Sequence, residues 1–350
     1  MRERAFHPES VRSILVLRLY FIGDVLLSTP VLEALKNAFP NATTSVMVKW
    51  RAAAVLLGNP HVDETLVYDG VPNYHSARWV LGLARELRRR RFSLAVDLTG
   101  DLRSSWMLLA GDPAFRVGFN HARMEFLLDR RIEYLSTGHV VDHLLTAVEP
   151  LGATATSRKP RLYLSDEERD AARSLLSSAG VDEAEGTVVL SPGANWEHRR
   201  WSPARFGAVA AHARERLGLA PVVIGSKGDM GLAEEVVSAS GGAAVSLAGR
   251  TDLRELAAVA ERASVFVGND SGPMHVAAAV GTPVVALFGP NTPERFAPRV
   301  VPSVVLTKDF ECSPCAQRSC VRPEDDCMSA IGVDEVTGAM ERLLAEGGRR

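Results

Sequence analysis

Short apolar runs alternate with longer amphipathic segments along the whole sequence, and this alternation restricts the chain to one class of fold. Strands alternating with helices predict βαβ units and a parallel sheet. In the first half of the chain, strands are expected at 13–19, 44–48, 65–68, 94–98 and 115–119. Helices are expected there at 25–39, 50–57, 75–90, 102–110 and 140–151.

The second half repeats this alternation after a polar segment at 153–164, which we interpret as an interdomain linker. Ser165 is a candidate N-cap with Glu168 three residues later and Gly180 past the end, so a helix is expected between them. Further strands are expected at 187–191, 221–225, 244–247, 264–268 and 283–288. Further helices are expected at 203–217, 230–239, 252–262, 272–280 and 332–345.

The prediction is an α/β protein with two Rossmann-like, doubly wound domains, at 1–160 and 161–331, that face each other across a cleft. A length of 350 residues agrees with two domains. Doubly wound sheets bind ligands beyond the carboxyl ends of their strands, so two of them suit a two-substrate site.

Composition and charge indicate an ordinary soluble protein. The chain is 46% hydrophobic and carries a net charge of −2, which argues against a protein built around nucleic acid. The first apolar run is short, interrupted by Arg18 and without a small-residue cleavage site, so it does not resemble a signal peptide. No apolar run reaches the ~20 residues that cross a bilayer. A cytoplasmic location is expected, with contact to a membrane surface left open.

The strongest candidate site is the turn in "VFVGNDSGPMHV", where a strand leads into a helix. Free backbone N–H groups and the positive end of the dipole make a helix start an anion site, and glycine lets a phosphate approach closely. The alternative is that two of these residues only cap the helix. The candidate residues are Asn269, Asp270, Ser271, Gly272 and His275.

A second candidate is the loop in "LSPGANWEHRRW", which follows a predicted strand directly. Its arginines are suited to bind a phosphate through two parallel hydrogen bonds or to stack on a ring. The alternative is a solvated basic loop beside a core tryptophan. The candidate residues are Ser191, Gly193, Asn195, Arg199 and Arg200.

Gly23 and Asp24 follow the first predicted strand, in "YFIGDVLLSTP". An acid at this place is either a helix cap or a general base, and a base needs reach to the substrate and a suitable pKa. The pattern alone leaves both readings open.

The cysteines are clustered near the end of the chain, in "FECSPCAQRSCVRPEDDCM". Four thiolates suit one tetrahedral zinc or iron ion, although their spacing is tighter than in a usual zinc ribbon. Disulfides and free thiols are the alternatives. The candidate ligands of a structural metal are Cys312, Cys315, Cys320 and Cys327.

Four consecutive arginines end an amphipathic predicted helix: Arg88, Arg89, Arg90 and Arg91. Cations at a helix C-terminus are electrostatically favoured in any case. A basic helix with apolar residues can also rest on an anionic membrane surface.

Taken together in this order, the motifs resemble the heptosyltransferases of glycosyltransferase family 9. The matching pieces are "ILVLRLYFIGDVLLSTPVLEALKNAFPNA", "SPGANWEHRRW", "ASVFVGNDSGPMHVAAAVGTPVVALFGPNTPERFAP" and "CSPC…C…CM…DEV", which extend over nearly the whole chain. The resemblance implies a GT-B fold in which the N-terminal domain binds the acceptor and the C-terminal domain binds the nucleotide sugar. It also implies that the last helix, in 332–350, packs back on the N-terminal domain.

The resemblance implies transfer of heptose from ADP-heptose to the lipopolysaccharide inner core (lipid A-Kdo or a heptosyl acceptor), with inversion and no cofactor for catalysis. Asp24 is implied as the general base, and its neighbours Tyr20, Phe21 and Ile22 are expected to desolvate it. Asp270 is implied to lie near the sugar hydroxyls or the phosphate turn. The loop around Arg250, Thr251 and Leu253 is implied to border the adenine.

One departure from the family pattern concerns the arginine loop. Members commonly carry Lys-Arg-Trp-Pro where this chain has Arg199-Arg200-Trp201-Ser202. The charge is retained, but the geometry of a guanidinium differs from that of an ammonium group.

Three other functions remain open. They are a related transferase with another nucleotide sugar or a protein acceptor, a non-catalytic nucleotide- or metal-binding relative, and an NAD-dependent oxidoreductase. The last is disfavoured because no G-x-G-x-x-G follows the first predicted strand.

Overall fold

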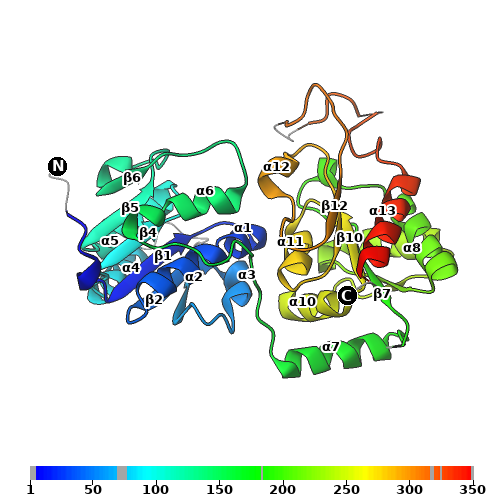
Figure 1. Cartoon of the computed structure of the whole chain (residues 1–350), viewed down its shortest axis with the longest axis horizontal. Helices are drawn as coiled ribbons and strands as arrows, with labels where there is room; N and C mark the ends of the chain where they lie inside the picture. Colours follow the sequence, from blue (N-terminus) through cyan, green and yellow to red (C-terminus); the bar gives the residue numbers. More distant parts are fainter. Residues whose placement is uncertain (1–4, 69–76, 183, 316–318, 324, 348–350) are drawn as a thin grey trace. The chain divides into compact units, whose positions relative to one another are not determined.

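The computed structural model describes residues 5–68, 77–182, 184–315, 319–323 and 325–347. The chain forms two compact units, Met1–Arg161 and Leu162–Arg350 (Figure 1). The division falls one residue after the boundary that the sequence suggests.

The first unit is built around a parallel sheet in the order β3-β2-β1-β4-β5-β6. Its strands are β1 (Ser13–Arg18), β2 (Thr43–Lys49), β3 (Glu64–Tyr68), β4 (Leu94–Asp97), β5 (Phe115–Phe119) and β6 (Arg130–Ile132). Its helices are α1 (Ile22–Leu27), α2 (Thr29–Ala38), α3 (Trp50–Ala53), α4 (Ala77–Arg89), α5 (Leu102–Gly111) and α6 (Val140–Thr146). Short 3₁₀ turns are η1 (Pro8–Ser10), η2 (Ala54–Leu56), η3 (Glu125–Leu127) and η4 (Glu149–Leu151).

The second unit has the same strand order when its strands are counted from its own start: β12-β11-β10-β7-β8-β9. Its strands are β7 (Thr187–Ser191), β8 (Ala220–Val223), β9 (Val245–Ser246), β10 (Val265–Asn269), β11 (Val284–Leu287) and β12 (Ser303–Leu306). Its helices are α7 (Asp166–Ser178), α8 (Pro203–Leu217), α9 (Met230–Ala239), α10 (Leu253–Arg262), α11 (Gly272–Ala279), α12 (Pro293–Phe296) and α13 (Val333–Gly347). Its 3₁₀ turns are η5 (Glu197–Arg199) and η6 (Lys227–Asp229).

The central strands were predictable because both of their faces are buried. Every residue of β10 and every residue of β7 is buried, and such strands read as continuous apolar runs. The helix expected at 25–39 is instead two helices. Pro30 has no N–H to donate to the Leu26 carbonyl, and the Thr29 hydroxyl donates to that carbonyl at 2.8 Å instead.

The expected start of α7 is confirmed. The Ser165 hydroxyl accepts from the Glu168 N–H at 3.3 Å, and the Glu168 carboxylate accepts from the Ser165 N–H at 2.8 Å. Each side chain thereby satisfies one backbone donor at the end of the helix.

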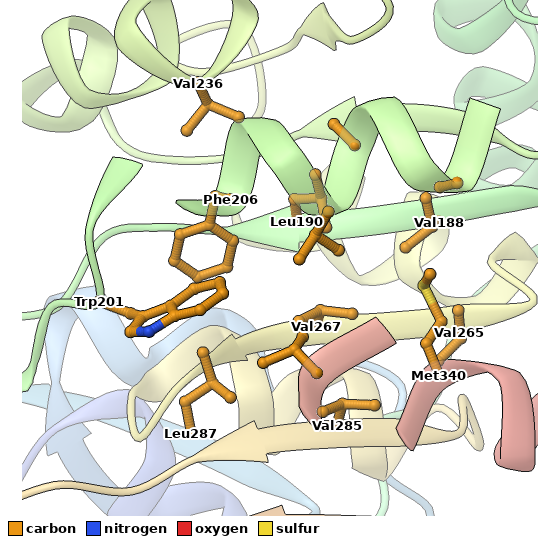
Figure 2. Packing of buried hydrophobic residues seen from close by; sticks show 14 of the residues in the cluster. Val188, Leu190, Trp201, Phe206, Val236, Val265, Val267, Val285, Leu287 and Met340 are labelled. Atoms are coloured by element: carbon orange, nitrogen blue, oxygen red, sulfur yellow. The ribbon is translucent and has the colours of Figure 1, made fainter. Parts of the chain in front are cut away.

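The core of the second unit gathers around Trp201 and Phe206, whose rings meet edge to face with centroids 5.1 Å apart (Figure 2). The indole N–H of Trp201 donates to the Ile331 carbonyl at 3.0 Å, so its one polar atom is satisfied in the core.

Helix α13 belongs to this core, and the expected packing of the helix in 332–350 on the N-terminal domain stays a prediction. It packs against α8 and against the strands β10, β11 and β12. Its apolar face, with Val336, Met340 and Leu343, is buried there, and Met340 lies beside Val265 in Figure 2. Burying this face stabilises the helix in the second unit, since each such side chain contributes about 1.5–3 kcal/mol.

Each sheet has a point where the chain reverses its direction of winding: between β1 and β4 in the first, and between β7 and β10 in the second. Ligands of doubly wound sheets bind beyond the carboxyl ends of the strands at such points. The chain places Asp24 after β1 and Asp97 at the end of β4. It places Ser191 at the end of β7 and Asn269 at the end of β10.

Candidate active-site residues

The turn between β10 and α11 holds a buried carboxylate. Oδ2 of Asp270 accepts from Nη1 of Arg199 at 2.9 Å and from Nδ2 of Asn291 at 2.8 Å. The Asp270 side chain is only 5% exposed. The positive charge of Arg199 offsets the free-energy cost of removing this carboxylate from water. Arg199 and Asp270, from separate predicted motifs, are therefore brought together.

The alternative prediction, that Asp270 and Ser271 only cap α11, is wrong. Ser271 occupies the N-cap position, yet its hydroxyl makes no capping hydrogen bond and is buried without a partner. The first turn, which starts at Gly272 and includes buried His275, therefore keeps its backbone N–H groups free of side-chain caps. A buried orphan hydroxyl at a helix start is a place where a ligand would complete the hydrogen bonding.

Asn269 joins the two motifs through the backbone. Its Oδ1 accepts from the Trp201 N–H at 3.1 Å, and its Nδ2 donates to the Pro192 carbonyl at 2.8 Å. The arginine loop and the loop after Ser191 are thereby both fixed to the end of β10. Trp201 itself is a core residue, as expected if the arginines belonged to a solvated basic loop beside a core tryptophan.

Gly193 lies at a close approach of the loops that follow β7 and β8. A Cβ atom on Gly193 would lie 2.7 Å from Cγ of Asp229, whose carboxylate is held by the Ser226 N–H and hydroxyl. Arg200 braces the same loop, because its Nε and Nη2 donate to the Ala194 carbonyl at 3.0 and 2.9 Å. Its guanidinium is thus engaged with the backbone, while Asn195 is exposed.

The loop predicted to border an adenine leads into α10. Asp252 caps this helix by accepting from the N–H groups of Arg254 and Glu255. Thr251 precedes the cap, and its buried hydroxyl has no partner. Leu253 is the first helical residue and is partly buried.

In the first unit, Asp24 lies in the first turn of α1, with Gly23 buried beside it. Its Oδ2 accepts from the Phe21 N–H at 3.3 Å, and Nη2 of Arg18 lies 3.4 Å from its Oδ1. The carboxylate therefore caps the helix, as one reading held, and still has 31% of its side chain exposed. Asp24 can therefore cap α1 and remain accessible to a substrate at the same time.

The expected desolvation of Asp24 by its neighbours is not found. Phe21 is 63% exposed, and its ring lies under Nζ of Lys49 at 5.1 Å from the centroid. Tyr20 turns its hydroxyl to the Thr99 carbonyl at 3.0 Å.

Two residues that the sequence analysis missed complete these arrangements. Asn291 holds Asp270, and its signal was a polar residue in the loop after a buried strand. Asp97 ends β4 and is almost wholly buried; burial raises its pKa to about 6, against hydrogen bonds from Gly100, Thr99 and Ser104. Its signal was an acid inside the apolar run at 94–98.

Comparison with known proteins decides the family. The family profile described as "Glycosyltransferase family 9 (heptosyltransferase)" matches residues 80–324. The chain belongs to this family. It is a glycosyltransferase, as predicted.

This glycosyltransferase is 30% identical to lipopolysaccharide heptosyltransferase 3 of Escherichia coli over 287 residues, which cover 77% of this chain and 81% of the relative. It is similar in structure to a family 9 glycosyl transferase of Veillonella parvula, with a TM-score of 0.86, 28% identity and coverage of 96% and 97% of the two chains. A TM-score of 0.79 relates it to E. coli ADP-heptose lps heptosyltransferase II, at 22% identity and coverage of 96% and 99%. The predicted GT-B fold is confirmed.

The cysteines of this glycosyltransferase are free and partly buried. Burial raises the pKa of the Cys327 thiol to about 11, and the charge of Asp326 acts in the same direction. Within the described ranges, no group of three or more His, Cys, Asp or Glu side chains is arranged to hold a metal ion. The metal site on Cys312, Cys315, Cys320 and Cys327 stays a prediction.

The arginine run is largely paired with acids. Arg88 lies 3.4 Å from Asp112, Arg89 lies 3.0 Å from Glu86, and Arg90 pairs with both Glu86 and Glu64. Arg88 and Arg89 nevertheless remain 70% and 75% exposed. Across the part of the chain that the structure describes, no helix is long and apolar enough to traverse a bilayer.

Proposed function

We propose that this glycosyltransferase moves heptose from ADP-heptose to the inner core of lipopolysaccharide, with lipid A-Kdo or a heptosyl residue as acceptor, and with inversion at the anomeric carbon. The names of its relatives, lipopolysaccharide heptosyltransferases 3 and 2 and the core heptosyltransferase OpsX of Haemophilus influenzae, support the substrate class. The observation that carries the mechanism is the Asp24 carboxylate, held by two donors at the carboxyl end of β1 and still accessible.

The second unit binds the donor in this proposal. The orphan hydroxyls of Thr251 and Ser271 and the uncapped start of α11 offer hydrogen bonds to ADP-heptose. Arg199 and the helix dipole stabilise the negative charge that develops on the departing diphosphate. Arg200 stabilises the conformation of the loop after β7 by donating to the Ala194 carbonyl.

The first unit binds the acceptor and supplies the base. Asp24 takes the proton of the acceptor hydroxyl as its oxygen forms a bond to the anomeric carbon. The bond from this carbon to the diphosphate breaks, and ADP leaves with the electron pair. The rings of Phe21 and Trp50 are exposed, and each has a cation over it, Lys49 over Phe21 and Arg51 over Trp50. These groups support binding of a sugar-bearing anion at this edge.

The proposal includes peripheral contact with the cytoplasmic face of the inner membrane through Arg88–Arg91. Its support is the exposure of Arg88 and Arg89 near the end of α4, a helix in which Leu81 is also exposed. Exposed cations near a surface are attracted to anionic lipid.

The test compares the wild-type protein with Asp24→Asn, which keeps the shape of the side chain. The expected result is a loss of about 10²–10⁴-fold in kcat with ADP-heptose and unchanged ADP affinity by calorimetry. Asp63→Asn, which changes an ion-paired surface acid of the same unit, is the control and keeps full activity. Unchanged turnover of Asp24→Asn would exclude Asp24 as the base.

A donor panel tests the substrate class. ADP-heptose, UDP-sugars and GDP-sugars are offered with a lipopolysaccharide precursor and with protein acceptors. Transfer only from a UDP- or GDP-sugar would exclude ADP-heptose as the donor, and transfer only to protein would exclude lipopolysaccharide as the acceptor. Binding of nucleotide without transfer from any donor would indicate a non-catalytic relative.

A further inference from the structure

Arg18 is a buried cation at the carboxyl end of β1, directly before the segment that carries Asp24. Its side chain is only 5% exposed, and it follows four buried apolar residues of β1, a central strand of the sheet. Arginine is almost never buried in this way unless it is paired, because removing its charge from water is costly.

The guanidinium of Arg18 is fixed from several sides. Nη1 donates to the Leu98 carbonyl, and Nε donates to the Asp24 carbonyl at 3.2 Å. Its carbon lies 5.1 Å from the centroid of the Tyr20 ring, and the Tyr20 hydroxyl donates to the Thr99 carbonyl. The group is thus bound to the segment after β4 on one side and to α1 on the other.

One nitrogen of the guanidinium faces the side chain of Asp24. With Nε and Nη1 engaged by carbonyls, Nη2 lies 3.4 Å from Oδ1 of Asp24, and the Phe21 N–H serves Oδ2. Each carboxylate oxygen therefore faces a donor, and the two donors leave the carboxylate one orientation. Burial lowers the pKa of Arg18 while the charges of Asp24 and Asp97 raise it, and a guanidinium keeps its proton in proteins.

We infer that Arg18 is the positioning residue for Asp24: it sets the orientation of the carboxylate through the Asp24 carbonyl and Oδ1, and touches no substrate itself. The inference rests on the proposed role of Asp24 as the base. A base held out of line loses most of its effect, since displacements of about 1 Å cost around 100-fold in rate.

Arg116 supplies a matched control. It is also a buried arginine of the same sheet, 8% exposed, and it binds Asp112 and the Leu127 carbonyl. It lies one residue after the start of β5, whereas Arg18 is the last residue of β1. Arg116→Met removes a buried guanidinium without touching the neighbourhood of Asp24.

The experiment measures kcat, KM for ADP-heptose and ADP affinity in the full-length protein. Arg18→Met is expected to lower kcat about 100-fold with unchanged ADP affinity. Arg18→Lys is expected to recover part of this loss, because an ammonium group keeps the charge but cannot make all three contacts of the guanidinium. Arg116→Met keeps kcat within about twofold, although its thermal stability falls as much as that of Arg18→Met. Equal losses of kcat in Arg18→Met and Arg116→Met would overturn the inference.

A double-mutant cycle separates positioning from mere structural support. If Arg18 acts through Asp24, Arg18→Met costs no further rate in an Asp24→Asn background. A double variant whose loss in kcat equals the product of the two single losses would contradict the inference. If Arg18→Met does not fold, Arg18→Lys takes its place in the same cycle, and full activity of Arg18→Lys would also contradict it.

The two possible failures are distinguishable. Full activity of Asp24→Asn refutes the proposed base, whatever Arg18 does. Loss of activity in Asp24→Asn together with full activity in a folded Arg18→Met variant refutes only the positioning role.

Discussion

Nη1 of Arg199 lies 2.9 Å from Oδ2 of Asp270, across 71 positions of the sequence. The acid is almost wholly buried and the arginine is 22% exposed, so the pair presents its cationic side to solvent. The sequence suggested a phosphate role for Arg199 and a sugar or phosphate role for Asp270. Their pairing indicates that Asp270 orients Arg199, and Arg199 is the member of the pair that is more accessible to a ligand.

Replacing Arg199 separates these roles. Arg199→Ala is expected to weaken ADP binding about 10–100-fold, because a charge-assisted hydrogen bond contributes about 1.5–3 kcal/mol. It also leaves Asp270 buried without its cation, so the free energy of unfolding falls by about 3 kcal/mol. Calorimetric titration with ADP and urea unfolding measure the two effects.

The double variant Arg199→Ala/Asp270→Asn is the control. It removes the unpaired charge, so stability returns while ADP binding stays weak. Arg214→Ala, which changes a surface arginine paired with Glu185 in the same unit, alters neither quantity. Wild-type ADP affinity in Arg199→Ala would contradict the ligand role.

The sheets could be predicted because parallel strands buried on both faces leave long apolar runs. The strands β6 and β12 could not be predicted in this way. In β6 two of three residues are arginines, and in β12 all four residues are half-exposed. Edge strands with one open side need no continuous apolar run, so the pattern that identifies central strands is weak there.

The site was predictable only where a turn follows a strand. Asp24 and Asp270 stand in such turns, and their residue type drew attention to them. Asn291 also follows a buried strand, but its partner Asp270 is 21 positions away, and no local pattern indicates which residue it contacts. Arg18 did leave a signal, a charge within an apolar run, but only the structure shows that Asp24 lies beside it.

Gly193→Ala tests the close approach of two loops in the second unit. The added methyl group would lie 2.7 Å from Asp229 Cγ, and Asp229 cannot retreat without leaving both Ser226 donors. Overpacking of this kind costs about 1–3 kcal/mol, and displacement of the loop weakens ADP binding.

Gly231→Ala is the matched control in the same unit. Its Cβ would meet no atom within 4 Å, and α9 gains up to about 1 kcal/mol from the better helix former. A thermal midpoint for Gly193→Ala equal to that of Gly231→Ala would show that the loops accommodate the methyl group freely.

Sedimentation with vesicles tests the arginine run. Arg88→Gln/Arg89→Gln is expected to weaken binding to vesicles of anionic lipid about fivefold for each charge removed, since each basic residue near the surface contributes about 1 kcal/mol. Arg214→Gln is the control for loss of a cation elsewhere. Unchanged sedimentation of the double variant would remove the run from the proposed membrane contact.

Arg90 gives a contrasting outcome. It is 23% exposed and pairs with Glu64 and Glu86, so Arg90→Gln is expected to lower stability more than vesicle binding. Vesicle binding that depends on Arg90 more than on Arg88 and Arg89 would indicate an indirect effect through α4.

The buried carboxyl of Asp97 makes the stability of the chain depend on pH in an unusual direction. Burial raises its pKa from 3.8 to about 6, so between these values the folded state holds a proton that the unfolded state has lost. Its contribution is fully present below pH 3.8 and is lost as the pH rises through about 6. The size is on the order of 3 kcal/mol, at 1.36 kcal/mol for each unit.

Asp97→Asn removes this titration while an amide still accepts from the Thr99 and Gly100 N–H groups. The difference in free energy of unfolding between the wild-type protein and Asp97→Asn, measured by urea at pH 4 to 8, is expected to favour the variant increasingly as the pH rises. Asp63→Asn is the control of opposite sign. Burial raises the pKa of Asp63, but hydrogen bonds from Lys36 and Thr44 outweigh it and hold that pKa low, so its contribution is lost as the pH falls. A difference for Asp97→Asn that does not vary with pH would mean that this carboxyl keeps its ordinary pKa in the folded protein.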